Sequence, residues 1–312
     1  MPETAPAPVP TAILVVGEAL IDIVHAADGT VDEHPGGSPA NVALTLARLG
    51  QDAHLLTWFG EDAYGSVLRR WLRSSGVNLV PQSTSAAKTS VAVARLDATG
   101  AAEYEFDLEW RLPREPALPP AVAVHTGSIA AVVPPGGDDV LELLQRAHAT
   151  ATISYDPNIR PSLMGRHLTV APKVEAIMMA SDVVKVSDED LAWLYPHRRP
   201  EVSGALWHKR SGVPVVMTRG KDGAIAWTRA GTVEVAGVDV TVVDTVGAGD
   251  SFMGALLHGL AQAGLLGAAR REALRNIDEP TMRGILEQSA RVAAITVSRA
   301  GANPPRLNEL GV

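Results

Sequence analysis

The stretch Asp-Thr-Val-Gly-Ala-Gly-Asp at residues 244–250 combines two glycines with two carboxylates. A β-rich run over 232–243 leads into it and a helical apolar pattern over 251–264 follows, which predicts a strand-to-helix turn. The first turn of such a helix offers free N–H groups and the positive end of the helix dipole, and both suit a phosphate. Asp250 would repel that anion. One chemistry that requires an acid there is general base catalysis, in which the carboxylate takes the proton from an attacking hydroxyl.

The plain alternative is a βα turn in which Asp250 is the N-cap of the helix, a common use of Asp. Two other phosphate motifs are excluded. A Rossmann fingerprint needs a glycine where Phe252 stands, and a Walker P-loop needs a Gly-Lys-Ser/Thr run that the chain lacks. By itself the stretch leaves both interpretations of Asp250 open.

A second glycine-rich motif, Gly-Gly-Ser-Pro-Ala-Asn-Val-Ala, occupies residues 36–43. Gly36 and Gly37 allow the backbone to approach a ligand closely, and Asn41 offers both a donor and an acceptor, as the vicinal hydroxyls of a sugar require. The alternative is a Gly-Gly turn with Ser38 as the N-cap of the following helix. Asp22 lies inside an apolar stretch and is either an outward-facing strand residue or an acceptor for two sugar hydroxyls.

Together the two motifs resemble the signatures of the PfkB, or ribokinase-like, family of carbohydrate kinases. They occur in the family's order, and the resemblance extends from about Ile13 to Pro305. It implies an α/β fold, a ribokinase-like three-layer sandwich with a mostly parallel central sheet and a small β-sheet lid. It also implies transfer of the γ-phosphoryl group of MgATP to a sugar hydroxyl, with Asp250 as the base and the amides of Gly247, Ala248 and Gly249 as an anion hole.

The resemblance assigns further roles. The residues assigned to the substrate are Asp22, Gly36, Gly37, Asn41 and Arg160. The planar fork of Arg160 could clamp phosphate or substrate, and the alternative is a surface arginine after a Pro-Asn turn. The roles for the nucleotide fall on Lys185, Ser187, Thr218, Gly220 and Gly223.

Residues 185–190 resemble the family's Asn-x-x-Glu segment, which helps to hold magnesium through waters. Here Ser187 replaces the Asn and Asp190 replaces the Glu, and a helix-capping segment is the plain alternative. Asp244, with backbone carbonyls near 299–305, matches the region that holds a monovalent cation such as K⁺ in many members, although Pro305 replaces a hydroxyl ligand found in some. The implied cofactors are ATP and Mg²⁺, with K⁺ in the region of Asp244.

Alternating strand and helix patterns predict the elements that position these residues. Most of the polar groups follow predicted strands, where open α/β sheets bind ligands. Two β-like runs, 90–96 and 101–108, interrupt the alternation of strands and helices, and a hairpin signal at 97–100 lies between them. We therefore expect a lid formed from about 18–35 and 88–109, and the resemblance adds a homodimer contact through it. The other predicted strands are 13–16, 53–59, 122–125, 152–155, 182–186, 213–218 and 224–227, and the main helices are 39–49, 64–75, 138–150, 170–180, 202–210, 251–264 and 281–297.

Composition narrows the class of protein. A chain of 312 residues with 46% hydrophobic content fits one kinase domain over 11–312, after a Pro- and Ala-rich stretch, 1–10, that we expect to be a disordered tail. The net charge of −8 argues against nucleic acid as a partner, and no apolar run is long enough for a membrane span. The absence of cysteine excludes thiol chemistry and fits a cytoplasmic enzyme. Nine histidines without HxH or HExxH spacing predict no tightly bound metal.

The form of the glycine-rich motif bears on the acceptor. Ribokinases typically carry Lys where this chain has Ser38, and the motif looks more like those of fructokinases and 2-keto-3-deoxygluconate kinases. A keto acid would require a cation in the sugar site, which Arg95 or Arg111 could supply, whereas a neutral ketose requires only groups such as Asp22 and Asn41. We predict fructose. The alternatives are 2-keto-3-deoxygluconate, ribose or a nucleoside, and a sugar-binding regulator without turnover, against which the intact Gly-Ala-Gly-Asp argues.

Overall fold

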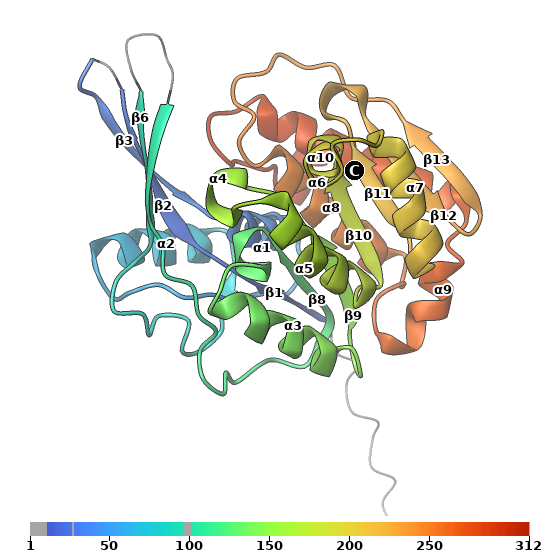
Figure 1. The fold of residues 1–312 in the computed structure, drawn as a ribbon, viewed down its shortest axis with the longest axis horizontal. Helices are drawn as coiled ribbons and strands as arrows, with labels where there is room; N and C mark the ends of the chain where they lie inside the picture. The colour runs from blue at the N-terminus through green and yellow to red at the C-terminus, as the bar shows by residue number, and fades with distance from the viewer. Residues whose placement is uncertain (1–10, 27, 97–101, 312) are drawn as a thin grey trace, which may run out of the picture.

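The computed structural model describes residues 11–26, 28–96 and 102–311 (Figure 1). Within these ranges nine strands form a central sheet in the order β13-β12-β11-β10-β9-β8-β1-β4-β5. The strands from β5 to β11 run parallel, and β12 and β13 are antiparallel additions at one edge. Their bounds are β1 Ala12–Val16, β4 Ala53–Leu56, β5 Asn78–Leu79, β8 Ala121–Gly127, β9 Thr152–Asp156, β10 Val183–Ser187, β11 Val215–Thr218, β12 Ala224–Thr228 and β13 Gly231–Val235.

Helices cover both faces of this sheet, as the continuous apolar run of β1 requires. Ile13 and Val15 of β1 share one core with α1, α8 and α10, whereas Leu14 and Val16 share the other with α3, α5, α6 and α7. The helices are α1 Ser38–Arg48, α2 Ala63–Ser74, α3 Gly136–Ala147, α4 Pro161–Met164, α5 His167–Met179, α6 Asp188–Leu194, α7 Pro200–Ser211, α8 Ala248–Gln262, α9 Arg271–Arg275 and α10 Glu279–Val297, with short 3₁₀ turns η1 Ile129–Ala131, η2 Gly220–Asp222, η3 Ala268–Arg270 and η4 Leu307–Leu310.

A separate sheet of four strands projects from the body in the order β3-β2-β6-β7 (Figure 1). Its strands are β2 Leu20–His25, β3 Val31–Gly36, β6 Val91–Leu96 and β7 Ala102–Asp107. Ile21 and Ile23 are buried on the face that packs with α2, and Tyr64 of α2 donates a 2.7 Å hydrogen bond to Glu33 of β3. Successive strand residues face opposite sides, so Asp22 points to the other face, opposite His34 in the register.

The predicted fold class is confirmed, because the layers, the mostly parallel sheet and the small second sheet are all present. The hairpin signal at 97–100 and the expected tail at 1–10 lie outside the described residues. Among the helices that the structure describes, none is long and apolar enough to cross a membrane.

The predicted strand over 232–243 is wrong in its second half. The strand β13 ends at Val235, which pairs with Ala224, the first residue of β12. Beyond that pair β12 offers no backbone partner, so 236–243 leaves the sheet despite its β-rich composition. The stretch 244–250 therefore follows a loop instead of a strand, although it still leads into a helix. Similarly, the strand predicted over 53–59 ends at Leu56.

Candidate active site

The carboxylate of Asp250 is buried in the first turn of α8. The N-cap of that helix is Gly247, with a φ of 76°, so the interpretation of Asp250 as the N-cap is wrong. Asp250 instead accepts three hydrogen bonds from residues distant in sequence. Its Oδ1 accepts from Ser38 Oγ at 2.7 Å and from Asn158 Nδ2 at 3.0 Å, and its Oδ2 accepts from Asn41 Nδ2 at 2.8 Å. These three donors fix the orientation of the carboxyl group beside the helix N-terminus.

The motif at 36–43 forms the turn into α1 and brings two of these donors to Asp250. The N-cap of α1 is Gly37, so the expectation that Ser38 caps the helix is also wrong. Gly37 has a φ of 107°, and a Cβ there would lie 2.5 Å from the carbonyl oxygen of Glu18. The Oδ1 of Asn41 is buried and has no hydrogen-bond partner among the described residues. A buried acceptor of this kind is normally satisfied, and a ligand hydroxyl could satisfy it.

Two carboxyl groups lie near Arg160 at the base of the four-stranded sheet β3-β2-β6-β7, which we call the lid. A Cβ on Gly36 would overlap Oδ2 of Asp22, so the glycine makes room for this side chain. Burial raises the pKa of Asp22 to about 6 against the opposing charges of His34 and Arg160.

Burial also raises the pKa of Glu18 to about 7, against hydrogen bonds that include one from Ser128 and against the charge of Arg160. Sequence reasoning missed Glu18, which has no motif around it.

A buried ion pair lies under the glycine turn. Lys185 Nζ is 2.9 Å from Asp156 Oδ2, and a Cβ on Gly249 would lie 3.0 Å from the same Nζ. Burial opposes the charge of Lys185, but Asp156, Asp190 and Asp250 outweigh it and raise the pKa of the ammonium group. Burial raises the pKa of Asp156 to about 6, although Lys185 opposes this. The predicted nucleotide residue Lys185 therefore places a positive charge beside the candidate anion hole.

The segment 185–190 ends β10 and begins α6 with a capping box. Ser187 Oγ accepts from the amide of Asp190 at 3.0 Å, and Asp190 Oδ2 accepts from the amide of Ser187 at 3.2 Å. Its Oδ1 accepts from the amide of Ile159 at 2.8 Å. The capping interpretation is therefore confirmed, and water-mediated magnesium binding by Asp190 stays a prediction. No group of three or more metal-ligating side chains occurs among the described residues.

The candidate nucleotide residues lie in a loop after β11. Thr218 ends this strand, and Gly220 begins η2 with a φ of 51°. Gly223 has a structural reason to be glycine, because its φ is 87° and a Cβ would overlap the carbonyl of Val235. The loop borders the segment 236–246, since a Cβ on Gly237 would overlap the carbonyl of Lys221. That segment exposes apolar side chains, namely Val238, Val242, Val243 and Val246.

Asp244 joins two loops near the start of α8. Its Oδ1 accepts from the amide of Val246 at 2.9 Å and its Oδ2 from the amide of Gly301 at 2.8 Å. The candidate cation region thus brings 244–246 against 299–305, as expected. Its use by a cation stays a prediction.

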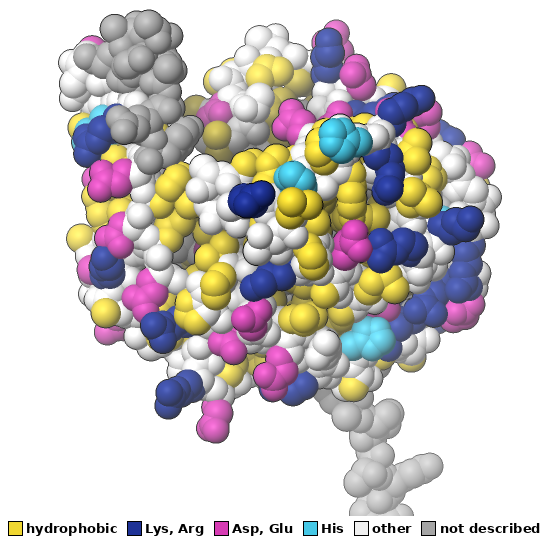
Figure 2. Space-filling model, viewed as in Figure 1, with side chains coloured by type: hydrophobic (Ala, Val, Ile, Leu, Met, Phe, Trp, Pro, Cys, Tyr) yellow, Lys and Arg dark blue, Asp and Glu magenta, His cyan; other side chains and the backbone are white. Residues whose placement is uncertain are grey.

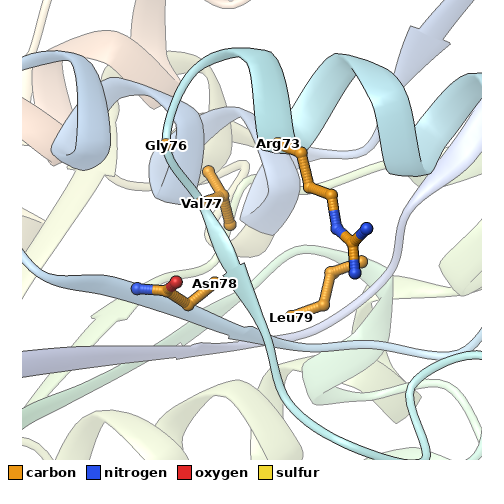
Figure 3. Close-up of a pocket in the computed structure, with 5 residues that line it drawn as sticks. All are labelled: Arg73, Gly76, Val77, Asn78 and Leu79. Carbon is orange, nitrogen blue, oxygen red and sulfur yellow. The ribbon is translucent and has the colours of Figure 1, made fainter.

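Two other surface features lie away from the cluster around Asp250. In Figure 2, Lys and Arg side chains gather over the side of the molecule near β13 and α9, away from the lid. Figure 3 shows a cavity lined by Arg73 and the 76–79 turn. Because this turn enters β5, which is parallel to β4, the cavity lies at the amino ends of the strands. It is therefore on the edge of the sheet opposite the cluster around Asp250.

Comparisons with known proteins agree with this geometry. The pattern of the pfkB family of carbohydrate kinases matches residues 10–309. A fructokinase from Rhizobium leguminosarum bv. trifolii is 34% identical over 283 residues, covering 87% of this chain and 85% of the relative. A structure of fructokinase with bound ATP from Xylella fastidiosa is 28% identical, with a TM-score of 0.80 over 96% of this chain and 97% of that one.

A Vibrio cholerae O395 fructokinase double mutant, solved with fructose, ADP and potassium ion, shares the fold at 23% identity and a TM-score of 0.76, with 94% of each chain covered. The match to the family pattern spans nearly the whole chain and contains both glycine-rich turns and the buried Asp250. The chain belongs to the pfkB family of carbohydrate kinases and is a phosphotransferase.

Proposed function

We propose that this sugar kinase transfers the γ-phosphoryl group of MgATP to a hydroxyl of fructose, with Asp250 as the general base. The observation that carries the assignment is the Asp250 carboxylate, fixed by three side-chain donors in the first turn of α8. In the step, the hydroxyl oxygen bonds to the γ-phosphorus while the bond to the ADP oxygen breaks. Asp250 receives the hydroxyl proton, and the amides of Gly247, Ala248 and Gly249 face the transferred group.

The sugar would lie between Asp250 and the lid. Asn41 supports this position because its unpartnered Oδ1 can accept from a hydroxyl while its Nδ2 holds the base. Asp22 supports it from the lid, next to Gly36. Arg160 lies near the carboxyl group of Asp22, which offsets its positive charge.

This balance of charge favours a neutral acceptor over 2-keto-3-deoxygluconate. The two lid-region arginines that could have bound a carboxylate are engaged elsewhere. Arg95 is opposite His25 in the register, on the face away from Asp22, and lies 3.9 Å from Glu105. Arg111 pairs with Glu109 at 2.9 Å. A keto acid would therefore bring an unpaired carboxylate into a partly closed site, which is costly.

The nucleotide would lie on the opposite side of the α8 N-terminus. Thr218 and Gly220 would border it, and the exposed valines of 236–246 offer an apolar surface for a base. Lys185 would neutralise phosphate charge from below the glycine turn.

Mg²⁺ fits a site of this kind as a partner of the nucleotide phosphates, because it usually keeps several waters and one or two carboxylates. When bound it supplies charge neutralisation between the phosphates. Asp190 would reach it through water, and Asp244 with the 299–305 loop would hold K⁺.

The acceptor is tested by measuring kcat/KM with MgATP for fructose, 2-keto-3-deoxygluconate, ribose and adenosine. We expect fructose to give the highest value. A preference for the keto acid that collapses in Arg95→Ala, Arg111→Ala or Arg160→Ala would overturn the choice of acceptor. A homodimer through the lid and a cytoplasmic location stay predictions, and sedimentation of the purified chain tests the first.

A further inference from the structure

The two oxygens of the Asp250 carboxylate have different surroundings. Its Oδ1 accepts two hydrogen bonds, from Ser38 at 2.7 Å and from Asn158 at 3.0 Å, and its Oδ2 accepts one, from Asn41 at 2.8 Å. A carboxylate oxygen has two lone pairs, so Oδ1 is fully used and Oδ2 retains one acceptor position. The free position is on the oxygen next to Asn41, the residue with the unpartnered Oδ1.

Asn158 is held rigidly in the turn after β9. Its φ is 39°, in the left-handed region that Asn enters more readily than most residues. Asp156 fixes the start of the turn through its ion pair with Lys185, and the amide of Ile159 fixes its end through Asp190. The Asn158 amide donates to Ser38 Oγ at 2.6 Å as well as to Asp250, which closes a triangle of three side chains.

We propose that Ser38 and Asn158 are positioning residues that anchor Oδ1 of Asp250, so that Oδ2 is the oxygen that receives the proton of the acceptor hydroxyl. This inference rests on the proposed function, in which Asp250 is the base. It gives Asn158 a role that a turn residue would not have, because its side chain selects the reacting oxygen. Ser38 provides the second anchor.

The test uses Asn158→Gly, which keeps the positive φ without strain and removes only the amide, and Ser38→Ala. With MgATP and the best sugar of the acceptor panel, kcat is measured across pH. We expect kcat to fall on the order of tenfold in each variant, because the carboxylate is no longer held in the orientation that presents Oδ2 to the acceptor hydroxyl. The acid limb of the kcat profile should move upward by about one pH unit, since the ionised carboxylate loses a donor.

The other charged groups toward Asp250 are Asp156 at the end of β9, Lys185 of β10 and Asp190 of α6. Neither variant alters them, so the shift is assigned to the lost donor. The matched control is Asn78→Ala, at the opposite edge of the sheet. Asn78 is an exposed asparagine that also donates to a carboxylate, Asp52 Oδ1 at 3.1 Å. Its profile should equal that of the unchanged protein.

Thermal unfolding of every variant is measured alongside, and if one variant does not fold the other decides. An unmoved acid limb and unchanged kcat in the folded variants, together with loss of turnover in Asp250→Asn, would overturn this inference and leave the proposed function intact. A shift of the acid limb in only one variant would overturn the proposal that both residues anchor Oδ1 and would assign that role to one of them. Full turnover in Asp250→Asn would overturn both proposals, since no base would then need positioning.

Discussion

Asp250 is a buried acid next to the proposed phosphate site, and its neighbours explain how the fold tolerates it. A buried carboxyl group without partners is expensive, but here three side-chain donors hydrogen-bond to it at the N-terminus of α8. The same donors leave one lone pair of the carboxylate for a substrate. The geometry thus offsets the cost of burial while keeping the group reactive.

We expect Asp250→Asn to lower turnover by about 10²–10⁴-fold, the usual effect of removing a general base. The side chain keeps its shape and loses only its basicity, so binding of MgATP and sugar should be nearly unchanged. Steady-state turnover and calorimetric titration of each ligand measure the two effects. Turnover close to that of the unchanged protein would remove Asp250 from its role.

Motif and residue chemistry predicted part of the site. Asp250, Asn41 and Lys185 were singled out because their types and neighbours suit phosphate and sugar chemistry, and the structure places all three in one cluster. Glu18 and Asn158 are not among the residues that the motifs predicted. Asn158 reaches Ser38 and Asp250 across 120 and 92 residues, and no local spacing signals such contacts.

The two glycines at the N-terminus of α8 differ in why the position requires glycine. Gly247 has a φ of 76°, and a Cβ there would lie 2.7 Å from Ala302 Cβ. Gly249 has an ordinary helical position, and its Cβ would meet only Lys185 Nζ at 3.0 Å. We predict that Gly247→Ala loses about 1–3 kcal/mol of stability through backbone strain. Gly249→Ala should keep its stability and lose turnover, because Lys185 and the γ-phosphate need that space.

The prediction is checked by measuring thermal unfolding and kcat for both variants and comparing the two. Normal kinetics with a large stability loss in Gly249→Ala would favour a purely structural turn.

The lid is tied to the body at the start of α2. Asp62 caps that helix through the amide of Gly65 at 2.8 Å, and it also accepts from the amide and the hydroxyl of Thr89, both at 2.7 Å. Thr89 lies two residues before the lid strand β6. We predict that Asp62→Ala loses about 1–2 kcal/mol of stability and raises KM for the sugar, because the lid loses its anchor.

Asp278→Ala is the matched control, since Asp278 caps α10 through the amide of Thr281 at 2.8 Å, and α10 packs against α8 and β13. It should lose similar stability without a change in KM. An equal rise of KM in both variants would show that the effect is not specific to the lid.

Periodicity and glycine positions predicted most helices and strands correctly, and most helix ends lie within a few residues of the prediction. The failures have a common cause. The residues 236–243 have strand composition but lie beyond the last pair of β12 and β13, and β5 is a two-residue strand that exists only because β4 lies beside it. Pairing is a property of the whole fold, so local composition could not decide either case.

For the whole molecule, Glu18 makes stability depend on pH. Burial raises its pKa from 4.5 to about 7, so the folded state holds this proton more tightly than the unfolded state. The resulting stabilisation is complete below pH 4.5 and is lost as pH rises to 7. Glu18→Gln stays neutral, so its stability relative to the unchanged protein should increase by about 3 kcal/mol between pH 4.5 and 8.

Urea unfolding at both pH values measures this difference. His125 acts in the opposite direction, because burial lowers its pKa to about 3, so its stabilisation is lost as pH falls below 6.5. Both proteins contain His125, and its effect cancels in the comparison. A difference that does not change with pH would show that Glu18 is ionised in the folded state.

The three donors to Asp250 also have a consequence for the synthesis of the chain. Ser38 and Asn41 precede Asp250 by 212 and 209 residues. At about 5–20 residues per second, they leave the ribosome on the order of ten to forty seconds before their acceptor exists. During that interval the nascent chain has no base, and the face of α1 that packs against α8 in the finished fold is uncovered. The base meets its donors only when α8 docks against α1.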